Sequence, residues 1–134
     1  MFKSVYVFDA YGTLFDVNSA ARVASAEPEH KALVAQWPTI SANWRRKQLE
    51  YTWLRAVADR HCDFWQITQD GLDWALEAAG IASAATRDRL LALYRELDAY
   101  AEVPRMLATL KERGARTAIL SNGSPDMLAA AVAS

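Results

Sequence analysis

Residues 5–16 read VYVFDAYGTLFD, an apolar run that ends at a carboxylate and a glycine. The β-branched and aromatic side chains of residues 5–8 predict a short strand that is buried on both faces of a parallel sheet. Asp9 follows this strand directly, and Gly12 breaks the apolar run. Because ligands bind beyond the carboxyl ends of the strands in open α/β sheets, Asp9 is predicted to face a crevice. The alternative is that Asp9 only turns the chain or accepts a hydrogen bond from a backbone amide.

The composition is that of a soluble globular protein, with 52% apolar and 23% charged residues in 134. A net charge of −1 gives no electrostatic argument for nucleic acid or an anionic membrane as a partner. No segment approaches the roughly 20 apolar residues of a membrane span. Residues 1–4 lead into the first strand without a signal peptide, so we expect a cytoplasmic protein.

The single cysteine and the two histidines suggest no site of their own. Cys62 cannot form an internal disulfide, fits a reducing compartment and is interpreted as a packing residue. His30 and His61 have no partner evident in the sequence, and we assign neither of them a role.

From residue 17 to residue 98 the spacing of apolar residues is helical. We predict helices over residues 17–26, 29–37, 39–60, 63–79 and 84–97. Pro38 is expected to end the second helix and Gly80 to end the fourth, with Asp63 or Thr68 opening the fourth. The third is the longest, and its predicted apolar face carries Trp44, Leu49, Trp53 and Val57.

A run of helices without an intervening strand cannot belong to the alternating βαβ layout that the first strand predicts. We therefore predict an α/β core, formed by residues 1–16 and 99–134, with a helical cap subdomain inserted at residues 17–98. The second core segment contains a predicted helix that begins near Pro104 and ends at Gly114. A short strand over residues 117–120 and a helix over residues 127–132 follow it.

The pattern DxYGTLFD, from Asp9 to Asp16, resembles the first motif of the haloacid dehalogenase superfamily, in which this Asp attacks the substrate and forms a covalent ester. The resemblance implies a Rossmannoid parallel-sheet core, incomplete in this chain, with an inserted helical cap. Phosphatases of the superfamily carry a second Asp two residues after the nucleophile and bind magnesium beside it. Tyr11 occupies that position here. Tyrosine does not serve as a carboxylic acid at neutral pH, but it can wall an apolar pocket. The resemblance is therefore to the 2-haloacid dehalogenase branch, which uses no metal or other cofactor.

Two further segments resemble the same family. Residues 44–55, WRRKQLEYTWLR, are similar to its cap helix, in which the arginine after the tryptophan, here Arg45, faces the active site and binds anions. Residues 120–125, LSNGSP, resemble its second motif, so Ser121 and Asn122 are implied to bind the negatively charged end of the substrate. Without the resemblance, Arg45 is a solvated helix charge and residues 121–125 are a turn with a helix cap.

Four other positions match the family pattern. Thr13 is expected to hydrogen-bond near Asp9, and Tyr11, Leu49 and Phe64 match residues that line the apolar substrate pocket. For Leu49 and Phe64, packing between helices explains the spacing equally well.

These resemblances imply an (S)-2-haloacid dehalogenase, which hydrolyses a 2-haloalkanoic acid to an (R)-2-hydroxy acid and halide. A magnesium-dependent phosphatase of the same superfamily is the second interpretation, and a helical interaction module without catalysis is the third. We also expect a homodimer formed through the helix-borne tryptophans Trp37, Trp44 and Trp53.

The family has two later motifs, a lysine after a further strand and a cluster of serine, asparagine and aspartate. The sequence ends at Ser134 before either of them. We therefore expect these 134 residues to be part of a longer enzyme or to depend on another chain, because two strands and a cap leave sheet edges uncovered.

Overall fold

The computed structural model describes residues 4–134, so the expected absence of a leader at residues 1–3 lies outside the described residues. The elements run in the order β1, α1, a 3₁₀ helix η1, α2, α3, α4, α5, β2 and α6. Their bounds are Val5–Phe8, Ser19–Ser25, Pro28–Leu33, Trp37–Val57, Phe64–Ala78, Ala84–Arg95, Val103–Glu112, Arg116–Ile119 and Pro125–Ala133. Within residues 4–134 no helix has the length and apolar character needed to cross a membrane.

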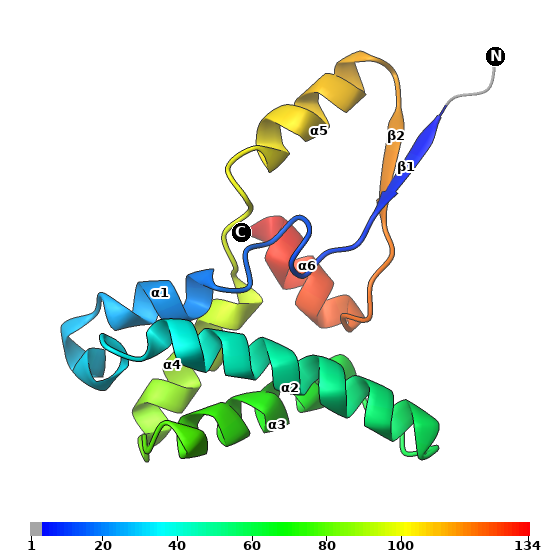
Figure 1. The fold of residues 1–134 in the computed structure, drawn as a ribbon. Helices are drawn as coiled ribbons and strands as arrows, with labels where there is room; N and C mark the ends of the chain where they lie inside the picture. The colour runs from blue at the N-terminus through cyan, green and yellow to red at the C-terminus, as the bar shows by residue number, and fades with distance from the viewer. Residues whose placement is uncertain (1–3) are drawn as a thin grey trace.

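The two strands, which are far apart in the sequence, pair in parallel. Val5 lies opposite Arg116 and Phe8 opposite Ile119. Helix α5 leads into β2 and lies beside it, on the side of the molecule away from α2 and α3 (Figure 1). Parallel pairing brings the carboxyl ends of both strands to the same edge, so Asp9 and the turn after β2 begin next to each other.

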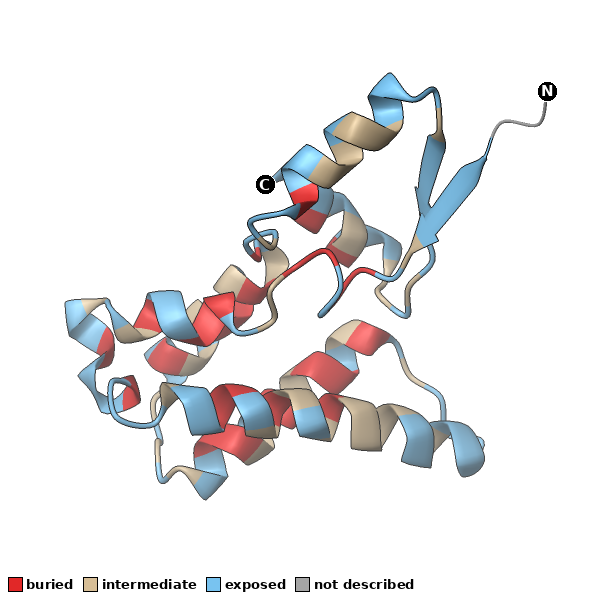
Figure 2. Ribbon diagram, turned by 45° about the horizontal axis from the view of Figure 1, so that its top comes forward, coloured by how far each residue is buried: buried red, intermediate tan, exposed pale blue. Residues whose placement is uncertain are grey.

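The strands are exposed, and the expectation of burial on both faces was wrong. Val5, Tyr6 and Val7 are 54%, 44% and 58% exposed, and β2 is exposed over three of its four residues. Figure 2 shows both strands almost entirely in the colour of exposed residues. The reason is that a sheet of two strands has no further strands beside it, and α5 is the main helix of the described residues that packs against β2. The expectation that two strands would leave sheet surface uncovered is confirmed.

The buried core lies mainly between the helices. Helices α2 and α3 run side by side (Figure 1), and Trp44 is 2% exposed between them. The indole Nε1 of Trp44 donates to the carbonyl oxygen of Thr68 at 2.8 Å. Gly71 permits this approach, because a methyl group there would lie 3.3 Å from the Trp44 carbonyl oxygen and the Gln48 backbone nitrogen.

Most predicted helix ends are confirmed. The Asp63 side chain accepts from the Gln66 backbone N–H at the start of α3, and Gly80 follows α3 with a φ of +70°. Gly114 follows α5 with a φ of +71°, and Pro104 lies in the first turn of that helix. These residues act as expected because Pro lacks the amide hydrogen that a first turn leaves unused, and Gly adopts the left-handed conformation without strain.

Two details of the helical region differ from the prediction. Pro38 lies in the first turn of α2 and does not end the preceding helix, which is a 3₁₀ helix over Pro28–Leu33. The predicted apolar face of α2 is buried only in its first half. Trp53 and Val57 are 63% and 89% exposed, although α3 reaches the end of α2 through the ion pair between Arg55 and Asp70. Trp44 is buried and does not contribute to a dimer surface.

Candidate active site

Asp9 lies directly after β1 and is exposed. The hydroxyl of Thr13 donates to Asp9 Oδ2 at 3.2 Å, which is the contact predicted from the sequence. A tight turn holds the two residues: the backbone N–H groups of Leu14 and Phe15 both donate to the Ala10 carbonyl oxygen, at 2.9 and 3.0 Å. The structure therefore presents the Asp9 carboxylate on a loop that is fixed by its own hydrogen bonds.

The loop is also tied to the segment that returns from α4. The backbone N–H of Asp16 donates to the Asp98 carbonyl oxygen at 2.8 Å, and the Tyr100 N–H donates to the Leu14 carbonyl oxygen at 3.0 Å. Arg22 then forms ion pairs with the Asp16 and Asp98 side chains at 2.7 and 3.3 Å. The segment that leaves the sheet after Asp9 and the segment that returns from α4 are therefore joined at residues 14–16 and 98–100.

Arg45 reaches this loop from the first half of α2. Its Nη2 donates to the carbonyl oxygen of Tyr11 at 2.9 Å, and its Nη1 donates to Gln48 Oε1 at 3.4 Å. A methyl group at Gly12 would lie 3.5 Å from Nη2, so the guanidinium rests closely against the turn. Within residues 4–134, Arg45 forms no ion pair. A partly buried guanidinium without a carboxylate partner is suited to bind an anion.

The Tyr11 side chain is packed between aromatic rings and is only 3% exposed. It stacks on Tyr94 with ring centroids 5.7 Å apart, and it meets the Phe64 ring at the same distance with a tilt of 40°. Its hydroxyl is buried without a hydrogen-bond partner in the described part of the chain. Burial raises the pKa of Tyr11 to about 12. The Tyr11 and Phe64 rings thus pack together, and Leu49 is half-buried on α2.

The turn with Ser121 and Asn122 lies at the same sheet edge as Asp9. The Leu120 N–H donates to the Phe8 carbonyl oxygen at 2.9 Å, which continues the strand pairing up to the turn. Ser121 Oγ accepts from the Gly123 N–H at 3.1 Å, and Asn122 is exposed. A Cβ at Gly123 would lie 2.8 Å from Tyr11 Cε2, so this turn and the Asp9 loop are in direct contact.

A buried polar cluster behind Arg45 was missed by sequence reasoning. Gln48 is fully buried and donates to Thr68 Oγ1 at 2.8 Å and to the Tyr94 hydroxyl at 3.1 Å. Burial raises the pKa of Tyr94 to about 12. A signal was available, because Gln48 follows Trp44 by one helical turn and therefore lies on the buried face.

Three residues set aside in the sequence lie away from this site. His30 is buried, and its Nδ1 lies 3.0 Å from Thr86 Oγ1, a partner that was not evident in the sequence. Cys62 contacts the Arg55 guanidinium, and His61 is exposed. No group of three or more His, Cys, Asp or Glu side chains within residues 4–134 is placed to hold a metal ion.

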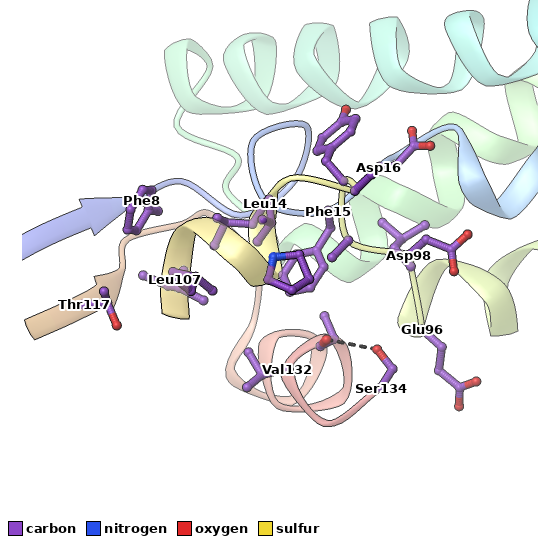
Figure 3. A pocket seen from close by; sticks show the side chains of 18 of the residues that line it. Phe8, Leu14, Phe15, Asp16, Glu96, Asp98, Leu107, Thr117, Val132 and Ser134 are labelled. Atoms are coloured by element: carbon purple, nitrogen blue, oxygen red, sulfur yellow. Dashed lines mark hydrogen bonds between the residues drawn. The ribbon is translucent and has the colours of Figure 1, made fainter. Parts of the chain in front are cut away.

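A large hollow lies on the other side of the loop that carries Asp9 and shares Leu14, Phe15 and Asp16 with that loop. It has a volume of about 1200 Å³ and lies between the loop at Leu14 and Phe15, helix α5, strand β2 and the end of α6 (Figure 3). Neither Asp9 nor Arg45 lines it. Its walls include the uncovered side of β2, so it is open surface of the two-stranded sheet.

Comparison with known proteins agrees with this arrangement. Residues 3–134 match the haloacid dehalogenase-like hydrolase family. The (S)-2-haloacid dehalogenase 1 of Pseudomonas sp. (strain CBS-3) is 44% identical over 94% of this chain and 54% of that protein. The (S)-2-haloacid dehalogenase of Xanthobacter autotrophicus is 42% identical over 99% of this chain and 50% of that protein.

The chain is also similar to solved structures of dehalogenases. A dehalogenase crystal structure has a TM-score of 0.86 and 40% identity, covering 98% of this chain and 56% of that one. The L-2-haloacid dehalogenase from Xanthobacter autotrophicus with chloropropionic acid covalently bound has a TM-score of 0.80 and 41% identity, covering 99% and 51%. The chain thus spans about half the length of the relatives it matches. With its fold, the first-motif loop and this similarity over nearly all residues, the chain belongs to the haloacid dehalogenase-like hydrolase family.

Proposed function

We propose that the protein containing this chain is an (S)-2-haloacid dehalogenase, which converts (S)-2-haloacids to (R)-2-hydroxy acids and halide. The observation that carries the proposal is the contact between Arg45 Nη2 and the Tyr11 carbonyl oxygen at 2.9 Å. It puts a guanidinium with no ion-pair partner in residues 4–134 against the loop that carries Asp9. The identity of 42–44% to proteins named (S)-2-haloacid dehalogenase supports the same substrate class.

The first proposed step is nucleophilic displacement at the 2-carbon. An Asp9 carboxylate oxygen forms a bond to that carbon, the carbon–halogen bond breaks with inversion, and the halide leaves with the electron pair. The Thr13 hydroxyl, 3.2 Å from Oδ2, orients the carboxylate for this attack. Holding the nucleophile in line with the reacting carbon is worth up to about 7–11 kcal/mol in favourable intramolecular cases.

The second proposed step is hydrolysis of the ester. Water attacks the carbonyl carbon of the esterified Asp9, the bond between that carbon and the ester oxygen breaks, and the product oxygen takes a proton. The product hydroxyl therefore carries an oxygen atom that came from Asp9. We propose this turnover for the full-length protein.

Substrate binding is proposed to use charge at one end and apolar surface at the other. Arg45 attracts the substrate carboxylate and stabilises the departing halide, and Ser121 and Asn122 supply donors at the turn after β2. Tyr11, Leu49 and Phe64 are proposed to form the apolar side. The Arg45 contact supports the first part of this assignment, and the packing of Tyr11 on Phe64 supports the second.

The arrangement of the helices supports a division into core and cap. We propose that residues 1–16 and 99–134 belong to the α/β core and that residues 17–98 form a cap over the crevice. The hydrogen bond from α2 to the Asp9 loop joins the two. We further propose a homodimer through the exposed end of α2, where Trp53, Leu54 and Val57 are 63%, 64% and 89% exposed. A size-exclusion profile with only monomer would reject the dimer.

The function is tested by assaying the full-length protein for halide release from (S)-2-chloropropionate and for phosphate release from phosphate monoesters, each with and without chelator. The proposal expects halide release that survives the chelator and is abolished in Asp9→Asn. Asp88→Asn is the matched control, because Asp88 is an exposed carboxylate on α4 away from the loop. Chelator-sensitive phosphate release without halide release would favour the phosphatase, and halide release unchanged in Asp9→Asn would contradict the assigned nucleophile.

A further inference from the structure

A continuous line of hydrogen bonds connects the backbone of α3 to the Asp9 loop through buried side chains. It begins at Thr68, whose hydroxyl lies 2.7 Å from the Phe64 carbonyl oxygen. A carbonyl oxygen can only accept, so the single hydroxyl hydrogen of Thr68 is directed at Phe64. Thr68 Oγ1 must then act as an acceptor toward its other partner, Gln48, at 2.8 Å.

This requirement fixes which way the Gln48 amide points. Its NH₂ group must face Thr68, so its oxygen faces the opposite side, where Arg45 Nη1 lies 3.4 Å away. The Tyr94 hydroxyl lies 3.2 Å from the same oxygen and 3.1 Å from the amide nitrogen, so it can pair with the Gln48 amide in either orientation. A guanidinium has only donors, so the flipped amide would turn its own NH₂ group toward Arg45 and lose the contact.

The line is fully buried from Thr68 to Gln48 and partly buried at Arg45. Gln48 and Thr68 have no exposed surface, and Tyr94 is 2% exposed. Buried polar groups are costly unless each finds a partner, so removing one member disturbs the others. The neighbouring cations differ: Arg46 and Lys47 lie over the Trp74 ring and take no part in the line.

We propose that Gln48 is a positioning residue that sets the Arg45 guanidinium against the Asp9 loop, with its own orientation set by Thr68. One end of the guanidinium is held by Gln48 and the other by the Tyr11 carbonyl oxygen, 2.9 Å from Nη2. The inference rests on the proposed function, in which Arg45 binds the substrate carboxylate. Neither Gln48 nor Thr68 needs to touch the substrate.

Thr68→Val tests the proposal, because valine keeps the branched shape but cannot accept from Gln48. In the full-length protein we expect the KM for (S)-2-chloropropionate to rise about tenfold or more, with a smaller change in kcat, since substrate binding depends on Arg45. Thr68→Ser keeps the hydroxyl and should restore the KM to within about twofold of the wild type. The matched control is Thr86→Val, which removes another buried threonine hydroxyl, the one beside His30.

The Thr86→Val control distinguishes a loss of Arg45 positioning from a general loss of stability. Both valine variants lose a buried hydrogen bond and should show similar falls in melting temperature, but only Thr68→Val should raise the KM. Equal KM values in the two valine variants would overturn the role of Gln48 while leaving the proposed function intact. Failure of the wild-type protein to release halide would reject the proposed function itself.

Gln48→Glu provides a second variant in case Thr68→Val does not fold. A carboxylate at this position keeps an oxygen toward Arg45 but neutralises its charge by an ion pair, and it places an acceptor against Thr68. We expect a rise in KM of about tenfold or more in the folded variant. A folded Gln48→Glu protein with wild-type KM would also overturn the proposal.

Discussion

Arg45 Nη2 donates to the carbonyl oxygen of Tyr11 at 2.9 Å, although the two residues come from different parts of the fold. Arg45 is on α2, within the helical layer, and Tyr11 is on the loop after β1. The contact lies two residues after Asp9, and Gly12 leaves room for it. A charged donor on α2 therefore connects the helices to the loop of the candidate nucleophile.

Arg45→Lys is expected to reduce kcat/KM for halide release by about 10- to 100-fold. Lysine keeps the positive charge but lacks the fork of donors that reaches both Gln48 and the Tyr11 carbonyl oxygen. Loss of a hydrogen bond to a charged group costs about 1.5–3 kcal/mol, which corresponds to this range. Steady-state kinetics of the full-length variant provide the measurement.

Arg46→Lys is the matched control for that substitution. Arg46 is exposed, lies over the Trp74 ring and donates to Asn43 on its own helix. Its conservative replacement should leave kcat/KM within about twofold of the wild type, since exposed charges contribute little. Equal falls in kcat/KM for Arg45→Lys and Arg46→Lys would contradict a specific role of Arg45 in substrate binding.

Thr13→Val is expected to lower kcat about tenfold while leaving the KM nearly unchanged. The Thr13 hydroxyl donates to Asp9 Oδ2, and an exposed hydrogen bond to a carboxylate is worth about 1–2 kcal/mol. Thr13→Ser retains the hydroxyl and should keep most of the activity. If the valine and serine variants had the same kcat, orientation of Asp9 by Thr13 would be refuted.

Gly123→Ala is expected to destabilise the protein by about 1–3 kcal/mol, the usual cost of overpacking. The new methyl group would lie 2.8 Å from Tyr11 Cε2 and 3.2 Å from Leu128 Cγ. Denaturant unfolding measures the change. Combination with Tyr11→Leu removes the clashing ring atom, so the loss in the double variant should be smaller than the sum of the two single losses. Strict additivity would contradict the proximity of the two loops.

Tyr11→Phe and Tyr94→Phe are expected to change stability in opposite directions. The Tyr11 hydroxyl is buried without a partner in residues 4–134, so its removal should be neutral or raise the free energy of unfolding by about 1 kcal/mol. The Tyr94 hydroxyl bonds to Gln48, so its removal should lower the free energy of unfolding by about 1 kcal/mol. Urea unfolding of both variants at neutral pH tests the pair, and a stabilised Tyr94→Phe would be inconsistent with the hydrogen-bonded cluster.

The same tyrosines predict a loss of stability at high pH. Burial raises the pKa of each to about 12, above the ordinary value of 10.0. From about pH 10 to pH 12 the unfolded chain loses these protons while the folded chain keeps them, so the unfolded state binds fewer protons and the free energy of unfolding falls as pH rises. Below about pH 10 this contribution is constant. Each Phe variant should show a shallower decline over that interval than the wild type.

Local patterns predicted much of this structure. The strand over residues 5–8 and the caps at Asp63 and Gly80 could be predicted because each depends on neighbours in the sequence, and the contact between Thr13 and Asp9 was expected from the resemblance to the family. The pairing of the two strands could be expected from their shared pattern of apolar run and polar turn. The exposure of the two strands follows from the size of the sheet, because two strands have no further strands beside them.

Features that depend on distant neighbours could not be predicted in this way. Helical spacing alone treats Trp44 and Trp53 alike, but α3 covers only the first, and the second is 63% exposed. The cluster of Gln48, Thr68 and Tyr94 unites three helices, and no local pattern states that these side chains meet. Pro38 was compatible both with ending one helix and with starting the next. In the structure it lies in the first turn of α2.

The central claim is that Asp9 forms a covalent ester with the substrate, and the most direct measurement is a single-turnover reaction of the full-length protein in heavy-oxygen water. With enzyme in excess over (S)-2-chloropropionate, the product is analysed by mass spectrometry. The account predicts unlabelled lactate, with the heavy oxygen retained in the Asp9 carboxylate. Heavy oxygen in the product hydroxyl on the first turnover would mean that water attacks the substrate carbon directly, which contradicts the account.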